Sequence, residues 1–139
     1  MWLIFAFLSS LTAASVAILA KLGLKDIEPT LATTVRSVIM TAFLILASFF
    51  LGKFHGFPLN AFSSRDWLLI VLAGISGALS WLFYFVALRI GLATKVVAID
   101  RLSLVFVIVL AALFLGEALT WKSGIGTLLM VAGAILIST

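Results

Sequence analysis

Five apolar segments, each long enough to cross a lipid bilayer, account for most of this chain of 139 residues. A transmembrane helix needs about 20 apolar residues to span the hydrocarbon core. Hydrophobic residues make up 65% of the chain and charged residues 10%, which is more apolar surface than a soluble domain of this size can bury. The sequence therefore predicts an all-α membrane protein with five transmembrane helices. The expected spans are residues 2–20, 30–51, 67–88, 96–115 and 121–138.

These spans follow one another closely, so residues 1–139 are expected to form a single transmembrane domain. The longest connection, 52–66, is rich in turn-forming residues. Strands with alternating polar and apolar residues, which are typical of membrane barrels, are absent from the sequence. The first segment has no basic residue before Trp2 and is followed by Lys21, so we expect a membrane helix and not a cleaved signal peptide.

The composition excludes several kinds of chemistry. Cysteine is absent, so disulfides and thiolate sites cannot form. The single histidine, His55, lies in the long connection, where a histidine is more often solvated than a ligand or base. The sequence contains no Walker-type glycine loop, metal-binding motif or catalytic triad, so we expect no enzymatic activity, no cofactor and no metal. The net charge of +4 comes from scattered basic residues and does not indicate nucleic-acid binding.

Basic residues are divided almost evenly between the two faces of the membrane. If the helices alternate in direction, the loops on the side of the N-terminus hold Lys53, Arg65 and Lys122, and the other connections hold Lys21, Lys25, Arg89 and Lys95. This bias is too small to fix the orientation by the positive-inside rule. Two readings stay open: the chain inserts both ways round and pairs antiparallel, or the insertion machinery imposes a single orientation.

Three ionisable residues lie well inside the predicted spans: Arg36 in the second, and Asp100 and Arg101 in the fourth. Both spans begin at the same face, which places these residues roughly 6–9 Å beyond the helix starts. A charge at this depth is costly unless it is paired or faces a water-filled cavity. Neighbours on a helix point about 100° apart, so Arg36 is a better partner for Asp100 than Arg101 is. A purely structural pair and a cavity lining are equally open.

The third span adds aromatic and hydroxyl side chains. Trp81 and Tyr84 share one helix face, and Ser76 and Ser80 share a second face that overlaps the first. Such side chains are suited to line a cavity for a small amphipathic solute, although plain packing is the simpler interpretation for each residue alone. The candidate substrate-binding residues are Arg36, Ser80, Trp81, Tyr84, Asp100 and Arg101.

Small residues predict close contacts between helices. Gly74 and Gly77 lie on the third span, and Gly126 and Gly133 lie seven residues apart on one stripe of the fifth. The fifth span carries no charge after Lys122. We therefore expect it to be a scaffold or dimer-contact helix and not a wall of a pore.

Several motifs resemble a known family. Residues 74–78 (GISGA), 83–88 (FYFVAL), 93–97 (ATKVV) and 115–120 (LGEALT) are similar to the EamA-type repeat of the drug/metabolite transporter superfamily. Arg36 matches the arginine that this family often carries near the start of its second helix. The resemblance extends over nearly the whole chain, and the LGEALT element is its most distinctive part.

The resemblance implies one five-helix repeat where most relatives hold two, and hence a homodimer. Two copies, antiparallel by this interpretation, would enclose a cavity and work by alternating access. Family members often have a proline where this chain has Leu104, so a proline kink is not expected here. Glu117 lies at the end of the fourth span, where it opposes the helix dipole. We expect it to cap the fifth helix rather than to carry protons.

The sequence thus predicts a transporter of small metabolites or drugs in the cell (inner or plasma) membrane. The surplus positive charge of Arg36, Asp100 and Arg101 favours solutes that bear a carboxylate. Asp100 is a poor proton carrier, because the neighbouring arginines favour its ionised form. The alternatives are a partner subunit of a hetero-oligomeric transporter or of a flippase for lipid-linked substrates, and a purely structural membrane protein.

Overall fold

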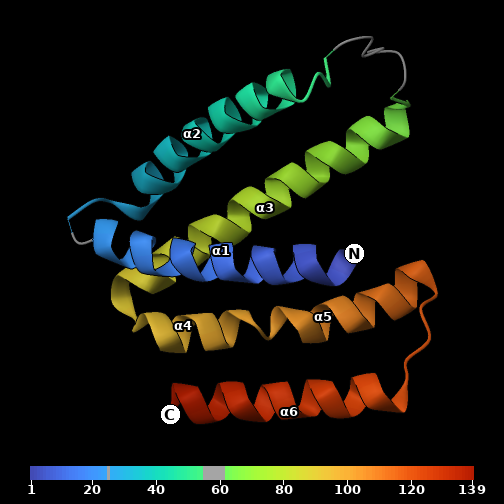
Figure 1. Ribbon diagram of the computed structural model, residues 1–139. Coiled ribbons are helices and arrows are strands. Elements are labelled where there is room, and N and C mark those ends of the chain that lie inside the picture. The colour runs from blue at the N-terminus through green and yellow to red at the C-terminus, as the bar shows by residue number, and fades with distance from the viewer. Residues whose placement is uncertain (25, 55–61) are drawn as a thin grey trace. The chain divides into compact units, whose positions relative to one another are not determined.

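The computed structural model describes residues 1–24, 26–54 and 62–139 of the chain (Figure 1). The described residues are almost entirely helical, and none of them forms a strand. The histidine of the long connection and Lys25 lie outside the described residues. In chain order the helices are α1 (Trp2–Gly23), α2 (Pro29–Phe50), α3 (Ser64–Ile90), α4 (Ala93–Asp100), α5 (Ser103–Leu110), the π-helix η2 (Ala111–Leu115) and α6 (Trp121–Ser138).

Five stretches of the described chain are long and apolar enough to cross a membrane, with α4, α5 and η2 together forming the span Ala93–Leu115. The predicted all-α membrane protein with five transmembrane helices is therefore confirmed. Large apolar side chains such as Phe50 and Trp121 are strongly exposed. Water would not tolerate so much apolar surface, but lipid covers it in a bilayer, where helices satisfy their own backbone hydrogen bonds.

The helix ends have local causes in the sequence. The Glu28 carboxylate accepts a hydrogen bond from the Leu31 backbone N–H, at 2.9 Å, and Pro29 occupies the first turn of α2, where the missing donor of proline does no harm. Thr120 and Ser123 cap the start of α6 with reciprocal hydrogen bonds. The expectation that Glu117 caps this helix is therefore wrong, since Thr120 supplies the cap.

Gly116 ends the fourth span. Its φ of 67° is in the left-handed region, which glycine adopts without steric cost. The Gly116 and Glu117 backbone N–H groups both donate to the Ala111 carbonyl, and this pattern is typical of glycine-terminated helix ends. The glycine of the LGEALT motif is thus required by the backbone turn that separates η2 from α6.

The fourth span covers Ala93–Leu115, but its helix is interrupted after Asp100. The last α-helical bond runs from the Arg101 N–H to the Val97 carbonyl, at 3.2 Å. The N–H groups of Leu102, Leu104 and Val105 instead donate to carbonyls three residues earlier, at 2.9–3.1 Å. A mid-helix stretch of such 3₁₀ bonding often marks a hinge or a functional site. The helix is interrupted here without a proline.

The helices fall into two compact units. The terminal unit contains Met1–Leu22 and Ile90–Thr139, and therefore α1, α4, α5, η2 and α6; the central unit contains Gly23–Arg89, and therefore α2 and α3. A single domain over the whole chain stays a prediction.

In the terminal unit, α4 lies antiparallel beside α6 (Figure 1). The Lys95 ammonium donates to the carbonyls of Ser138 and Thr139, at 2.9 and 3.1 Å. A cation at these carbonyls favours the C-terminal end of α6 electrostatically. The Lys21 ammonium at the end of α1 donates to the Gly91 carbonyl at 2.7 Å. Two basic residues that the sequence placed at helix ends thus tie the helices of this unit together.

In the central unit, the buried residues lie in the last turns of α3 and the first turns of α2. Leu88 and Phe85 of α3 are fully or almost fully buried, as are Thr33 and Pro29 of α2. The Thr33 hydroxyl donates to the Pro29 carbonyl at 2.8 Å, so its burial leaves no unsatisfied donor.

The glycines do not mark close helix contacts within the chain. A methyl group added at Gly74, Gly77, Gly126 or Gly133 would meet no atom within 4 Å. Close helix contacts at these glycines are therefore not seen within either unit, and the expectation that α6 is a scaffold or dimer-contact helix stays a prediction.

Candidate functional site

Arg36 of α2 lies against aromatic side chains of α3. Its guanidinium carbon is 3.7 Å from the centroid of the Trp81 ring and 5.6 Å from that of Phe85. The face of an aromatic ring carries negative electrostatic potential, and tryptophan attracts a cation most strongly. The arginine is half-buried, so this attraction acts where water compensates the charge only in part. Ring faces, and not a carboxylate, are the observed contacts of Arg36 within its unit.

Three aromatic rings of α3 form the surface beneath Arg36. The rings of Trp81 and Tyr84 meet edge to face, with centroids 5.5 Å apart and planes at 88°. Phe85 lies 5.9 Å from Trp81 and 6.4 Å from Tyr84. Edge-to-face packing is the preferred geometry of aromatic pairs, so the rings hold one another in place. The predicted shared face of Trp81 and Tyr84 is thus occupied by a packed aromatic cluster.

Phe85 was missed by the sequence reasoning. It is 3% exposed and lies four residues after Trp81, which places it on the same helix face. The spacing was visible, but Phe85 is one of 12 phenylalanines in the chain, so nothing in its sequence context distinguished it from a lipid-facing residue.

The stacking of Arg36 leaves an important part of its chemistry available. A ring contact uses the face of the guanidinium, whereas its five N–H donors lie in the plane and point outward from its edge. Those donors match the two oxygens of a carboxylate in a bidentate arrangement. Trp81 and Phe85 therefore present Arg36 in a geometry that suits recognition of an anionic group.

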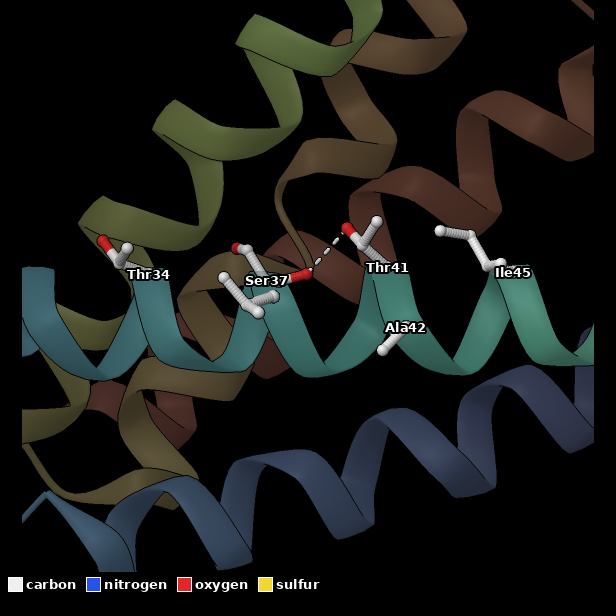
Figure 2. A pocket seen from close by; sticks show the side chains of 6 residues that line it. Thr34, Ser37, Thr41, Ala42 and Ile45 are labelled. Atoms are coloured by element: carbon white, nitrogen blue, oxygen red, sulfur yellow. Dashed lines mark hydrogen bonds between the residues drawn. The ribbon is translucent and has the colours of Figure 1, made fainter.

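A mostly apolar groove that includes three hydroxyl side chains runs along α2. Its volume is about 430 Å³, and Figure 2 shows Thr34, Ser37, Thr41 and Ile45 projecting from the same side of the helix. Each of the three hydroxyls donates to the carbonyl four residues earlier, at 2.8–2.9 Å. The hydroxyl protons are thus used by the helix itself, and the oxygen atoms remain as acceptors.

Asp100 and Arg101 lie at the break in the fourth span. Asp100 is the last residue of α4, and Arg101 follows it in the 3₁₀ segment. Both side chains are exposed. Arg101 also lines a groove of about 640 Å³ between α1, α4 and α6, whose other lining residues are mostly apolar. The charged residues of the fourth span therefore coincide with an irregular backbone, which in membrane proteins is tolerated where it lines a cavity or is buried in protein.

The structure brings only some of the predicted site residues together. Arg36, Trp81 and Tyr84 form one cluster in the central unit, and Ser80 is an exposed residue of the same helix, α3. Asp100 and Arg101 belong to the terminal unit, so the Arg36–Asp100 pair stays a prediction. Among the residues that the structure describes, no group of three histidine, aspartate or glutamate side chains is placed to hold a metal ion.

Comparison with known proteins gives a consistent result over the full length. The EamA-like transporter family matches residues 1–139. A protein of Sinorhizobium sp described as an uncharacterized transporter in the cobO 3′ region is 34% identical over 137 residues, which cover 99% of this chain and 96% of the relative. No solved structure matches the chain.

Proposed function

The chain belongs to the EamA-like transporter family, and from this premise we propose that two copies of it form a dimer that moves a small solute by alternating access. The chain is a multi-pass membrane transporter of the drug and metabolite kind, which implies a small-molecule substrate and a lipid bilayer around it. The proposal concerns the assembly, the mechanism and the residues that contact the solute.

The length of the repeat supports a dimer. The Sinorhizobium relative matches this chain over 96% of its own length, which supports a unit of one repeat. An odd number of crossings gives antiparallel copies the arrangement of an inverted repeat, in which transporters place a binding site between two halves. The open glycine stripe of α6, which contains Gly126 and Gly133, offers a surface for close helix contact.

The single observation that carries the site proposal is the stacked Arg36. A half-buried guanidinium inside a membrane helix is costly, and here the rings of Trp81 and Phe85 lie against it. We propose that Arg36, Ser80, Trp81 and Tyr84 contribute one part of the substrate path and that Asp100 and Arg101 contribute another. The in-plane donors of Arg36 favour a solute with a carboxylate.

Transport by reconstituted protein tests the site. The purified chain in liposomes is screened for uptake of radiolabelled amino acids, nucleobases and cationic drugs. We expect Arg36→Ala to abolish uptake of the solute found while monodisperse protein is recovered in nearly normal yield. Trp2→Ala, at an exposed tryptophan near the chain start, serves as the matched control and should transport normally. Loss of assembled protein in Arg36→Ala would instead identify a structural role.

The orientation of the chain tests the dimer. Reporter domains fused to the C-terminus, one active inside and one active outside the cell, should both give signal if the copies are antiparallel. Because the chain contains no cysteine, a single Gly133→Cys substitution reports contacts between copies without background. Signal on one side only would rule out the antiparallel homodimer, and a sedimenting monomer with full uptake would rule out any dimer.

A further inference from the structure

The terminal unit contains a second groove, separate from the Arg36 cluster. Its volume of about 640 Å³ falls within the range of about 300–1,000 Å³ in which proteins bind small ligands. Its walls are built from small or aliphatic side chains, including Ala14 of α1, Val97 and Ala98 of α4, and Ile137 of α6. Alanines on two facing helices leave the room that larger residues would fill. The groove is thus an apolar channel between three helices.

One charge lies in this apolar groove. Arg101 is the charged member of the described lining residues, and its sequence neighbour Asp100 is not among them. Residues 94, 97, 98 and 101 recur at spacings of three or four, so they share one face of the fourth span. Asp100 points about 100° away from that face. The groove therefore presents a cation to its occupant without the carboxylate that precedes it in the chain.

The position of the charge sets the shape of the ligand. Arg101 lies eight residues beyond Ala93, which corresponds to about 12 Å along the helix. Side chains on a helix lean toward its N-terminus, so Arg101 extends back along the groove toward Ala93. We propose that this groove binds an amphipathic monocarboxylate, whose carboxylate pairs with Arg101 and whose hydrocarbon part lies between α1, α4 and α6. This inference rests on the proposed function and names the substrate class for the terminal unit.

Other occupants match the groove less well. An uncharged helix face of a second copy would remove water from Arg101 without providing a partner, and an unpaired buried charge is strongly unfavourable. A cationic amphiphile would be repelled by the guanidinium. A carboxylate on an apolar chain can pair with the guanidinium while its hydrocarbon part packs against the apolar lining of the groove.

Binding to the full chain in phosphatidylcholine nanodiscs tests the proposal with radiolabelled decanoate as the probe. We expect saturable binding that unlabelled decanoate displaces and that decanol and decyltrimethylammonium do not. Arg101→Gln should weaken binding at least about tenfold, because hydrogen bonds to charged groups contribute that much, and Arg101→Lys should retain part of the affinity. Ala14→Phe should abolish binding by filling the groove while Arg101 stays in place. Ala6→Phe, at another exposed alanine of α1, should bind normally.

Three results would overturn the inference. Equal displacement by decanol would mean that only hydrophobic partition is measured, and unchanged affinity in Arg101→Gln would remove the charge from recognition. Spontaneous cross-linking of Ala14→Cys copies that decanoate does not suppress would show that a second copy fills the groove. If Arg101→Gln does not fold, displacement by the competitors and the binding measured for Ala14→Phe still show whether the groove binds the carboxylate.

Failure of this inference and failure of the proposed function are distinguishable. Decanoate binding requires neither transport nor a dimer, so binding without uptake would contradict only the proposed function. Uptake of a solute by a protein that does not bind decanoate would contradict only the groove assignment.

Discussion

The two arginines inside the membrane-spanning helices are accommodated in different ways. Arg36 lies in the uninterrupted helix α2 and rests on the rings of Trp81 and Phe85. Arg101 lies where the fourth span changes from α-helical to 3₁₀ hydrogen bonding, beside an apolar groove. The first charge is stabilised by side chains around a regular backbone, and the second coincides with an irregular backbone that leaves room around it.

This difference indicates a division of tasks. An arginine that is stacked on tryptophan has few alternative positions, so it can define where an anionic group binds. An arginine at a helix interruption can follow changes of the local backbone, because the surrounding hydrogen bonds are already displaced from their regular partners. Substitutions near each arginine can abolish this difference or measure it.

Proline substitution should separate the two regions most strongly. Leu44→Pro in α2 removes a regular helical hydrogen bond and introduces a steric clash, so it should lower the free energy of unfolding by about 3 kcal/mol. Leu104→Pro removes only the 3.1 Å bond from the Leu104 N–H to the Arg101 carbonyl, which predicts a loss of about 1 kcal/mol. Denaturant titration of both variants in detergent measures the difference. Equal losses would mean that the fourth span is as regular as α2.

Removal of the tryptophan should have the next largest effect. Trp81→Ala takes away the ring beneath Arg36, and a desolvated cation–π contact contributes about 2 kcal/mol. The free energy of unfolding should fall by about that amount, and Trp81→Phe should lose less because one ring face remains. Trp2→Ala is the matched control. Equal losses in the two alanine variants would show that Trp81 contributes no more than any lipid-facing tryptophan.

Substitution by lysine should lower the free energy of unfolding by different amounts at the two arginines. Arg36→Lys replaces a planar group that stacks on rings with a compact ammonium, so we expect a loss of about 1 kcal/mol. Arg101→Lys keeps the charge at a position without an aromatic partner, and its effect should stay within about 0.5 kcal/mol. Unfolding experiments on both variants under identical detergent conditions test this. A larger loss of unfolding free energy in Arg101→Lys than in Arg36→Lys would mean that Arg101, and not Arg36, is the arginine held in place by its contacts.

The smallest effect concerns the start of α2. Hydrogen bonds to the Glu28 carboxylate, first from the Leu31 N–H and then from Thr30, hold the pKa of this group below its ordinary value. A carboxylate whose pKa is lower in the folded state stabilises the fold above its unfolded pKa. That contribution is lost as the pH falls through the folded pKa.

Glu28→Gln should therefore reduce the fall in melting temperature between neutral pH and about pH 3, by less than the shifts expected for the arginine variants. An unchanged profile in Glu28→Gln would show that this cap does not contribute to the pH dependence.

Much of the fold could be predicted because it depends on length and polarity along the chain. Apolar runs define five spans, whereas the cap of α6 was expected from Glu117 and is supplied by Thr120. The break after Asp100 could not be predicted, because its usual sign is a proline and this chain has Leu104. The residues from 104 to 115 are uniformly apolar and give no other sign of a break.

The site was predictable only within single helices. A spacing of three residues places Trp81 and Tyr84 on one face, and the structure confirms their contact. The stacking of Arg36 on Trp81 depends on how α2 crosses α3, and no pattern within either helix encodes that crossing. The sequence predicts Asp100 as the partner of Arg36 because opposite formal charges are visible in a sequence. The attraction between a cation and the face of an aromatic ring depends on how the side chains pack, which a sequence does not show.

The interruption in the fourth span contains hydrogen bonds displaced by one residue. A 3₁₀ residue advances about 2.0 Å and turns 120°, whereas an α-helical residue advances about 1.5 Å and turns 100°. Each residue that exchanged one pattern for the other would thus rotate α5 by about 20° and shift it by about 0.5 Å. Leucine at position 104 retains the amide hydrogen that such a screw motion would need, which a proline would lack.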